Sequence, residues 1–468
     1  MFDLLRYKDN TAVITNRGEQ LTYGELNAEA AQFANAITEK GLVFCLCENR
    51  LGSLLGYVSC MKHHIPIVLL DGSKEASVIQ NLVEIYQPEF LWLLESQAKD
   101  YEGKKVYEYG AFALLRMRYA MEIDKPAINS ELALCLTTSG STGSPKFVRL
   151  SEANVMANAE SIAEYLEIDE SERPITTLPS YYSYGVSVIN SHLIKGATLL
   201  LTEGTVAQRE FWSFLKEQKA TSIAGVPYTY EMLKMLRFFR MDLPYLKTMT
   251  QAGGKLNKDI AKEYIEYAKE KGKRFFVMYG QTEATARMSY LPFEHALEKY
   301  ASIGIAIPRG KFSLIDVNGN TIEEPDVDGE LVYIGPNVSL GYAECRADLA
   351  KGDENHGELH TGDVARRDKD GFYYITGRMK RFVKVWGNRC NLDATEQLVK
   401  AITTSCACVG VDDKITIFVT ESGLELQIIN LLVNKTGLNN QAFEVRVIDA
   451  IPVKSSGKID YPAMQAML

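Results

Sequence analysis

The feature that most constrains the fold of this chain is an alternation of short apolar runs with amphipathic stretches, which extends from Leu21 to about Met278. The apolar runs, such as residues 275–278, are short and rich in large or β-branched side chains, as buried strands are. The amphipathic stretches, such as residues 51–62 and 207–218, have the length and periodicity of helices. Strands that alternate with helices predict an α/β domain in which a mostly parallel sheet is covered by helices on both faces.

One helix start is marked by its capping residues. Thr22 is followed three residues later by Glu25, which is the spacing of a capping box. In that motif the threonine hydroxyl and the glutamate carboxylate each accept a hydrogen bond from the other residue's backbone N–H. The sequence therefore predicts a helix that begins directly after Thr22.

After Arg287 the character of the chain changes, because Gly and Pro punctuate short strand-like runs such as residues 312–315 and 329–334. This part predicts a smaller β-rich subdomain. A second change in composition comes near residue 380. Residues 381–468 contain about three strand-like and two helical segments, which predicts a compact α+β unit.

The net charge and the cysteines indicate which binding partners and which cellular compartment to expect. Lys and Arg number 51 and Asp and Glu number 60, so the net charge is −9 and the pI is near 5.4. We expect no binding to nucleic acid, because the net negative charge of the protein repels polyanions. We expect no membrane insertion, because no apolar run reaches the roughly 18 to 20 residues of a transmembrane helix. The N-terminus lacks a signal-peptide pattern. Eight cysteines in mostly apolar stretches, without metal-site spacing, favour a reduced, cytoplasmic protein with no transition metal.

The densest chemical signal is a loop rich in Gly, Ser and Thr that ends in Lys146. It covers residues 137–146, directly after an apolar run, and we expect a helix to follow it. Backbone N–H groups, hydroxyls and one cation in such a loop suit a polyphosphate. The loop is not a P-loop, because the Gly-x4-Gly-Lys-Ser/Thr spacing fails.

Four further motifs follow along the chain. Residues 279–283 come after an apolar run, where a tyrosine can stack on a base and a Thr/Glu pair can meet phosphate and Mg²⁺. Residues 359–363 form an expected turn with one aspartate, which can accept hydrogen bonds from both hydroxyls of a ribose. Residues 378–384 include four cations. Residues 451–460 contain a lysine after a Gly turn close to the end of the sequence.

In this order and spacing the five motifs resemble the adenylate-forming superfamily of acyl-CoA synthetases, peptide-synthetase adenylation domains and luciferases. Residues 21–26, 65–71, 252–256 and 329–331 look like further family landmarks. The resemblance implies an α/β fold with a large N-terminal domain of helix-covered, mostly parallel sheets and a smaller β-rich subdomain. A small mobile C-terminal α+β domain follows. We expect the large domain to cover residues 1–379 and the small one residues 380–468.

The resemblance also implies the roles of individual residues. Lys458, Thr282 and Glu283 would be catalytic: Lys458 lies between the α-phosphate and the attacking carboxylate, Thr282 reaches the α-phosphate, and Glu283 holds Mg²⁺. Asp363 would bind the ribose hydroxyls with help from Arg378. The remaining ATP contacts fall on the phosphate loop and on the adenine site, namely Thr138, Ser139, Gly140, Ser141, Thr142, Gly143 and Lys146 for the phosphates, and Gly253, Gly254 and Tyr279 for the adenine.

The same resemblance implies a hinge and a thiol tunnel. Lys380, two residues after Arg378, matches the pivot on which the small domain turns between two docking poses. Gly387 would allow the close approach of a pantetheine arm. The expected acceptor is therefore CoA or the phosphopantetheine of a separate acyl carrier protein.

The expected acid pocket is formed by Tyr181, Tyr184, Gly185, Tyr228 and Met278. These residues suit a short acyl or aryl acid with one or two polar substituents. Residues 179–185 hold no acidic residue, so the ammonium of an amino acid would be buried unpaired, which costs several kcal/mol.

We therefore expect ATP-dependent activation of a small carboxylic acid through an acyl-adenylate, with loss of pyrophosphate and transfer to a thiol. Two alternatives remain open at this point. One is a free-standing amino-acid-activating domain. The other is a nucleotide-binding pseudoenzyme, which would have no reason to keep Lys146, Glu283, Asp363 and Lys458.

Overall fold

The computed structural model describes residues 1–38, 41–118, 125–137, 146–379, 381–386, 388–411, 413–454 and 459–468. The chain divides into two compact units. The first consists of Met1–Tyr300, Ala306–Lys311 and Ile334–Leu359, and the second of Ala301–Ile305, Phe312–Tyr333 and His360–Leu468. The expected boundary between residues 379 and 380 lies inside the second unit, and as a functional division it stays a prediction.

An eight-stranded sheet forms one part of the first unit, counted over the described residues. Its central strands β5, β3, β4 and β8 are parallel, and the pairs toward its edges are antiparallel. The strand order is β19 (Gly341–Ala343), β9 (Phe147–Ser151), β8 (Leu132–Thr137), β4 (Ile67–Asp71), β3 (Val43–Cys47), β5 (Phe90–Leu94), β7 (Phe112–Met117) and β6 (Gly103–Tyr109).

A second sheet of nine strands, again within the described part of the chain, has five consecutive parallel pairs flanked by antiparallel ones. Its order is β16 (Ile305–Ala306), β15 (Ser289–Tyr290), β14 (Arg274–Tyr279), β13 (Thr248–Gln251), β12 (Ser222–Gly225), β10 (Pro174–Ile175), β11 (Leu199–Leu201), β1 (Thr11–Thr15) and β2 (Gln20–Thr22). The expected α/β architecture is therefore confirmed.

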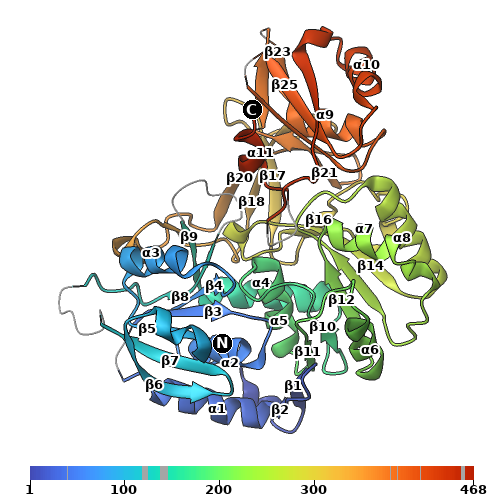
Figure 1. Ribbon diagram of the computed structural model, residues 1–468. Coiled ribbons are helices and arrows are strands. Elements are labelled where there is room, and N and C mark those ends of the chain that lie inside the picture. Colours follow the sequence, from blue (N-terminus) through green and yellow to red (C-terminus); the bar gives the residue numbers. More distant parts are fainter. Residues whose placement is uncertain are drawn as a thin grey trace. The chain divides into compact units, whose positions relative to one another are not determined.

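Helices cover both sheets, and two of them lie between the sheets (Figure 1). These two are α4 (Glu152–Tyr165) and α5 (Ser183–Leu193), whose apolar side chains join strands of both sheets in one buried core. The other helices of this unit are α1 (Tyr23–Asn35), α2 (Leu51–Lys62), α3 (Ala76–Tyr86), α6 (Arg209–Glu217), α7 (Pro227–Met235) and α8 (Lys258–Glu270).

Two expected helices are found where the sequence placed them. Helix α1 begins after Thr22, whose hydroxyl accepts a hydrogen bond from the Glu25 N–H at 3.1 Å, while the Glu25 carboxylate accepts one from the Thr22 N–H at 2.8 Å. Helix α2 has the bounds expected from its pattern. Local capping and periodicity are sufficient to define these elements.

The expectation of a helix directly after the phosphate loop was wrong. Strand β9 follows the loop, pairs antiparallel with β8, and only then does α4 begin. All five residues of β9 are buried. The strand is stabilised by pairing on both sides, with β8, which the apolar run before the loop predicts, and with β19, which nothing in the local sequence marks.

The second unit contains a four-stranded sheet among its described residues, with the order β17 (Lys311–Ile315), β18 (Gly329–Ile334), β20 (Glu358–Arg367) and β21 (Tyr373–Arg378). This confirms the β-rich subdomain. The expected turn over residues 359–363 was wrong, because these residues belong to β20. Gly362 has φ +68°, and the strand continues through it.

The C-terminal part was predicted with too few elements. The described residues form five strands and three helices: β22 (Phe382–Val385), β23 (Asn388–Asn391), α9 (Leu392–Val399), β24 (Cys406–Val411), β25 (Lys414–Val419), α10 (Glu425–Thr436), β26 (Phe443–Val447) and α11 (Tyr461–Gln465). Strands β22 and β23 pair as a hairpin, and β24, β25 and β26 form a sheet. The short, basic hairpin resembles a solvated face in sequence, which is why it was missed.

Two further findings concern the whole described chain. None of the helices that the structure describes has both the length and the apolarity that a bilayer span requires. The eight cysteines are all free; six are buried, Cys390 is half-buried and Cys345 is exposed.

Candidate active site

Several predicted site residues lie outside the described residues, and their roles stay predictions. They are the loop residues Thr138, Ser139, Gly140, Ser141, Thr142 and Gly143, the hinge residue Lys380, the tunnel residue Gly387 and the catalytic Lys458.

The loop after β14 holds the predicted Thr282–Glu283 pair in a strained backbone. Tyr279 is the last residue of β14, as expected, and Gly280 passes so close to the Ala286 carbonyl that a Cβ there would lie 1.7 Å from its oxygen. Thr285 and Ala286 have positive φ values of 57° and 99°, which cost energy in residues other than glycine. The loop is thus held in one conformation that presents Thr282 and Glu283.

Tyr342 brings two predicted ATP-site residues together. Its hydroxyl donates a hydrogen bond to Oε1 of Glu283 at 2.8 Å, and the ammonium of Lys146 lies 3.5 Å from the centre of its ring. Burial and the neighbouring Glu283 carboxylate raise the pKa of Tyr342, so the phenol remains a hydrogen-bond donor. The phosphate-loop lysine and the proposed magnesium ligand therefore contact opposite parts of one side chain.

Glu283 fits the role of a ligand for a hard cation. One of its carboxylate oxygens accepts the Tyr342 hydrogen bond, and the other has no hydrogen-bond partner among the residues that the structure describes. Carboxylate oxygens are the ligands that Mg²⁺ prefers, usually one or two together with phosphate oxygens.

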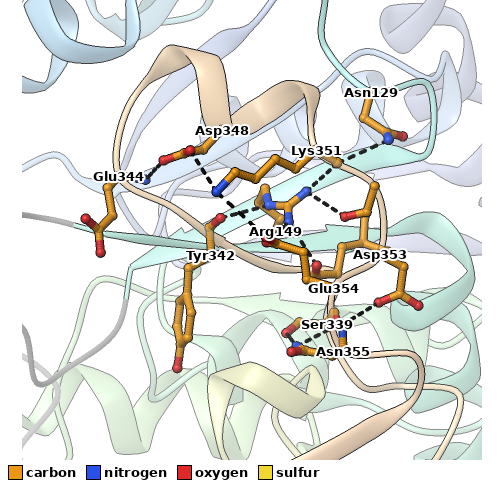
Figure 2. Close-up of polar contacts among 12 residues, drawn as sticks. Asn129, Arg149, Ser339, Tyr342, Glu344, Asp348, Lys351, Asp353, Glu354 and Asn355 are labelled. Atoms are coloured by element: carbon orange, nitrogen blue, oxygen red, sulfur yellow. Dashed lines mark hydrogen bonds and ion pairs between the residues drawn. The ribbon is translucent and has the colours of Figure 1, made fainter.

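The segment that carries Tyr342 is anchored by Arg149, a fully buried residue of β9 (Figure 2). Its guanidinium donates to the carbonyls of Leu340 (2.9 Å), Tyr342 (3.0 Å) and Gly352 (3.1 Å), and pairs with Glu354 at 2.6 Å. The Lys351 carbonyl accepts a further bond. Figure 2 shows the Tyr342 side chain pointing away from this cluster, so the guanidinium holds the backbone and leaves the phenol directed toward Glu283.

The same segment also supports the Thr282–Glu283 loop directly. The Ser339 N–H donates to the Glu283 carbonyl at 2.8 Å. Asn337 accepts a hydrogen bond from the Thr285 hydroxyl at 2.6 Å on its carbonyl and donates from its amide to the Ala284 carbonyl at 2.7 Å. Sequence reasoning missed Arg149 and Tyr342. A lone arginine in an apolar strand is a signal for a buried polar contact, whereas nothing in the sequence marks Tyr342.

The two predicted adenine-site segments end neighbouring strands. Strands β13 and β14 pair in parallel with Gln251 opposite Val277, so Gly253 and Tyr279 each come two residues further on. Gly253 has φ +82°, and the Gln251 side chain donates to the Gly254 carbonyl at 2.9 Å. Carboxyl ends of parallel strands are the usual place for ligands in such sheets.

The predicted ribose residues are adjacent in the second unit. Asp363 on β20 lies opposite Arg378 on β21, and the Arg378 Nε is 3.0 Å from Oδ1 of Asp363. Asp363 is only 2% exposed, whereas the Arg378 side chain is 60% exposed. Asp363 is therefore a fixed carboxylate beside a more exposed cation.

The predicted acid-pocket residues have different surroundings. Tyr184 is buried at the start of α5 and contacts Thr250 through its hydroxyl at 2.8–2.9 Å, and burial raises its pKa to about 12. At Gly185 a Cβ would lie 2.1 Å from the Pro179 carbonyl oxygen, so no other residue fits. Met278 is buried.

Two other predicted pocket residues are less enclosed. Tyr181 is half-buried against the core. Tyr228 is 54% exposed on α7, whereas Tyr230 on the same helix is fully buried. Their place in the acid pocket stays a prediction.

The loop and α5 are joined where the pocket begins. The Thr282 hydroxyl donates to the Ser183 hydroxyl at 3.1 Å, and Ser183 is the first residue of α5, directly before Tyr184. Sequence reasoning also missed Arg287, which follows the strained loop and whose guanidinium lies 4.7 Å from the centre of the Tyr184 ring. The predicted phosphate contact is thus continuous with the predicted acid pocket.

Comparison with known proteins adds to this geometry. The family model described as "AMP-binding enzyme" matches residues 3–343. A feruloyl-CoA synthase from Amycolatopsis is 25% identical over 431 residues, which are 87% of this chain and 84% of that protein. Two solved structures share the fold over 99% of this chain. One is o-succinylbenzoate CoA synthetase from Bacillus subtilis with its acyl-adenylate intermediate (TM-score 0.78, 22% identity, 97% of that chain). The other is ATP-bound MatB from Rhodopseudomonas palustris (TM-score 0.80, 20% identity, 98% of that chain).

Proposed function

Because the chain belongs to the family of AMP-binding enzymes, we propose that it is an acid–thiol ligase that activates a small carboxylic acid with ATP. The acid's carboxylate attacks the α-phosphorus, the bond to pyrophosphate breaks, and an acyl-adenylate forms. A thiolate then attacks the acyl carbon, and AMP leaves as the thioester forms.

The observation that supports this proposal most strongly is the Lys146–Tyr342–Glu283 arrangement beside Thr282. Attack of a carboxylate on ATP joins two anions, so the site must supply positive charge and fixed donors rather than a strong base. Lys146 supplies the cation at the end of the phosphate loop. Thr282, beside Ser183, supplies a hydroxyl at the junction with the acid pocket.

Mg²⁺ would be held by Glu283 and would offset the charge of the phosphate oxygens. The role of Tyr342 is to hold the Glu283 carboxylate in one orientation and to place the Lys146 ammonium near it. Asp363 and Arg378 would bind the ribose, and Tyr279 with Gly253 and Gly254 would enclose the adenine.

The second half of the reaction rests on the C-terminal residues. We propose that residues 380–468 turn about Lys380, so that one pose offers Lys458 to the forming adenylate and the other offers Gly387 to the thiol. CoA is the acceptor that the feruloyl-CoA synthase and o-succinylbenzoate CoA synthetase similarities favour. The pantetheine of a carrier protein offers the same thiol chemistry and is distinguished by assay.

An amino-acid-activating enzyme is the second candidate within the same chemistry. It is disfavoured because residues 179–185 offer no carboxylate to an ammonium group. A nucleotide-binding pseudoenzyme would bind ATP without any acid-dependent reaction.

The test is carboxylate-dependent ATP–pyrophosphate exchange with a panel of short acyl acids, aryl acids and amino acids, followed by detection of CoA thioesters by mass spectrometry. We expect exchange with acyl or aryl acids, and a loss of about 10²–10³-fold in Lys146→Ala. Lys234→Ala is the matched control, because Lys234 pairs with Glu263 on the surface. ATP binding without exchange for any acid would identify a pseudoenzyme, and exchange confined to amino acids would support the second candidate.

A further inference from the structure

Arg287 is a buried cation that the proposed reaction leaves unused. It is 2% exposed and follows Ala286 at the end of the strained loop. Its Nη1 lies 3.2 Å from both the Tyr165 hydroxyl and the Met278 sulfur, and its guanidinium lies over the ring of Tyr184. All of these partners are neutral.

No carboxylate among the residues that the structure describes lies within 4 Å of this guanidinium, since Arg287 forms none of the ion pairs found there. Its Nε is buried without a hydrogen-bond partner, and the hydrogen bonds that its guanidinium makes to described residues both come from Nη1. Burying an unpaired charge is strongly unfavourable, so proteins normally supply a counter-charge. Among the residues that the structure describes, none supplies a counter-charge at the Nε–Nη2 edge.

Arg287 also lines a cavity between α5 and strands β10, β12 and β13. His192 lines it as well, and burial lowers the pKa of His192 to about 4, so the ring is neutral at pH 7. Glu172 is the acidic residue among the cavity's described lining, but its carboxylate accepts a hydrogen bond from the Thr221 hydroxyl and lies beyond 4 Å of the guanidinium. Among its described lining residues, the cavity, about 20 Å³ in volume, therefore contains a cation and no carboxylate within 4 Å of it.

We propose that Arg287 determines specificity by binding a second carboxylate of the acid, so that the substrate is a short dicarboxylic acid. This inference rests on the proposed function. The Nε–H and Nη2–H groups form the parallel pair of donors that matches the two oxygens of a carboxylate. Nη1, which is the nitrogen already hydrogen-bonded, lies outside that pair.

The position of Arg287 defines which carboxylate is activated. Thr282 contacts Ser183, and the next residue, Tyr184, lies under the guanidinium. One carboxylate at Thr282 would meet the α-phosphate while the other reaches Arg287 along the first turn of α5. The same charge repels the ammonium of an amino acid.

The test uses the wild-type enzyme first. ATP–pyrophosphate exchange is measured with a series of short dicarboxylic acids, each compared with the monocarboxylic acid and the monoamide of the same chain length. The monoamide keeps the shape and removes one charge. We expect kcat/KM for the best diacid to exceed that of its monoamide by about 10- to 100-fold, because hydrogen bonds to a charged group are roughly this strong.

The variant Arg287→Met then keeps much of the side-chain volume without the charge. It should reduce the diacid-to-monoamide ratio to about one while KM for ATP stays unchanged, and the diacid should raise the melting temperature of the wild type only. Arg309→Met is the matched control, because Arg309 is a surface residue paired with Glu164, and its ratio should equal that of the wild type.

Each outcome bears on one proposal. Equal or faster exchange with monocarboxylic acids, monoamides or amino acids in the wild type overturns the assignment of Arg287 and leaves the ligase intact. Exchange with no acid at all overturns the proposed function and this inference with it. Should Arg287→Met fail to fold, the wild-type ratio alone decides.

Discussion

Replacing Arg149 by methionine tests whether one buried guanidinium holds the segment that orients Glu283. Methionine fills similar space and is apolar, so the change removes the charge and the donors while leaving little cavity. The donors lost are those to the carbonyls of Leu340, Tyr342, Lys351 and Gly352, together with the ion pair to Glu354.

The expected loss of stability depends on whether the groups that lose their hydrogen bond to Arg149 are buried or exposed. Four hydrogen bonds from a charged donor, at about 1.5 kcal/mol each, sum to about 6 kcal/mol. Lys351 and Gly352 are exposed and Glu354 is 47% exposed, so water replaces their partner. Leu340 is only 4% exposed, so water replaces little of the hydrogen bond that its carbonyl loses. We therefore expect a loss of about 3–5 kcal/mol in the free energy of unfolding, because the carbonyls of Leu340 and Tyr342 are left without a donor.

The assay is urea unfolding followed by circular dichroism, together with ATP–pyrophosphate exchange at saturating acid. Arg149→Met should lower the urea midpoint and reduce exchange, since Tyr342 no longer holds Glu283 in place. The matched control Arg309→Met removes an exposed pair with Glu164 and should cost less than about 1 kcal/mol. Equal losses in the two variants, or full exchange activity in Arg149→Met, would refute the reasoning.

The remaining predictions concern the two half-reactions and the strained loop. Lys458→Ala should lower adenylate formation by about 10²–10³-fold while thioester formation from supplied acyl-adenylate persists; equal loss in both half-reactions contradicts the two-pose proposal. Lys380→Pro should let acyl-adenylate accumulate with little thioester, as measured by quenched-flow, because a fixed φ hinders rotation; a variant that makes thioester at the normal rate places the hinge elsewhere. Gly280→Ala should displace the loop, because its Cβ would lie 1.7 Å from the Ala286 carbonyl oxygen; we expect loss of exchange and a melting temperature lower by several degrees. Gly352→Ala is the control, because the atom nearest to its added Cβ lies 4.0 Å away, and it shows the cost of a glycine change where space is free.

The α/β fold could be predicted from the sequence wherever the signal is local. Helix α1 is defined by its capping box and α2 by its apolar run, and the structure places both as expected. Strand β9 was misread because it pairs with β19, which is distant in sequence. Residues 359–363 were misread because they belong to a strand that lies between β18 and β21 in the sheet. Turn-like residues such as Gly362 can occur within a strand when neighbouring strands supply the hydrogen bonds.

The residues of the candidate site likewise fall into those that short sequence motifs indicate and those that only the fold brings together. Tyr279, Thr282 and Glu283 are contiguous, and Asp363 and Arg378 lie in short motifs, so sequence could single them out. Tyr342, Arg149 and Arg287 could not be found by spacing. The Arg149 guanidinium meets the Leu340 carbonyl across 191 residues of sequence, and a tyrosine in a three-residue strand has no local signature.

The long reach of these contacts has a consequence for how the protein is made. The first unit is discontinuous in sequence, because residues 334–359 belong to it although most of residues 301–333 belong to the second unit. The Tyr86 hydroxyl donates a hydrogen bond to the carbonyl of Ala343, which lies 257 residues further along the chain. During synthesis, one edge of β9 stays unpaired until β19 leaves the ribosome. Until then Arg149 also lacks the carbonyl groups that accept its hydrogen bonds, such as those of Leu340 and Tyr342. Contacts of such sequence separation slow folding and expose strand edges to other chains. We therefore expect the N-terminal unit to complete its fold only after translation has passed residue 359, and fragments that end near Tyr300 to aggregate.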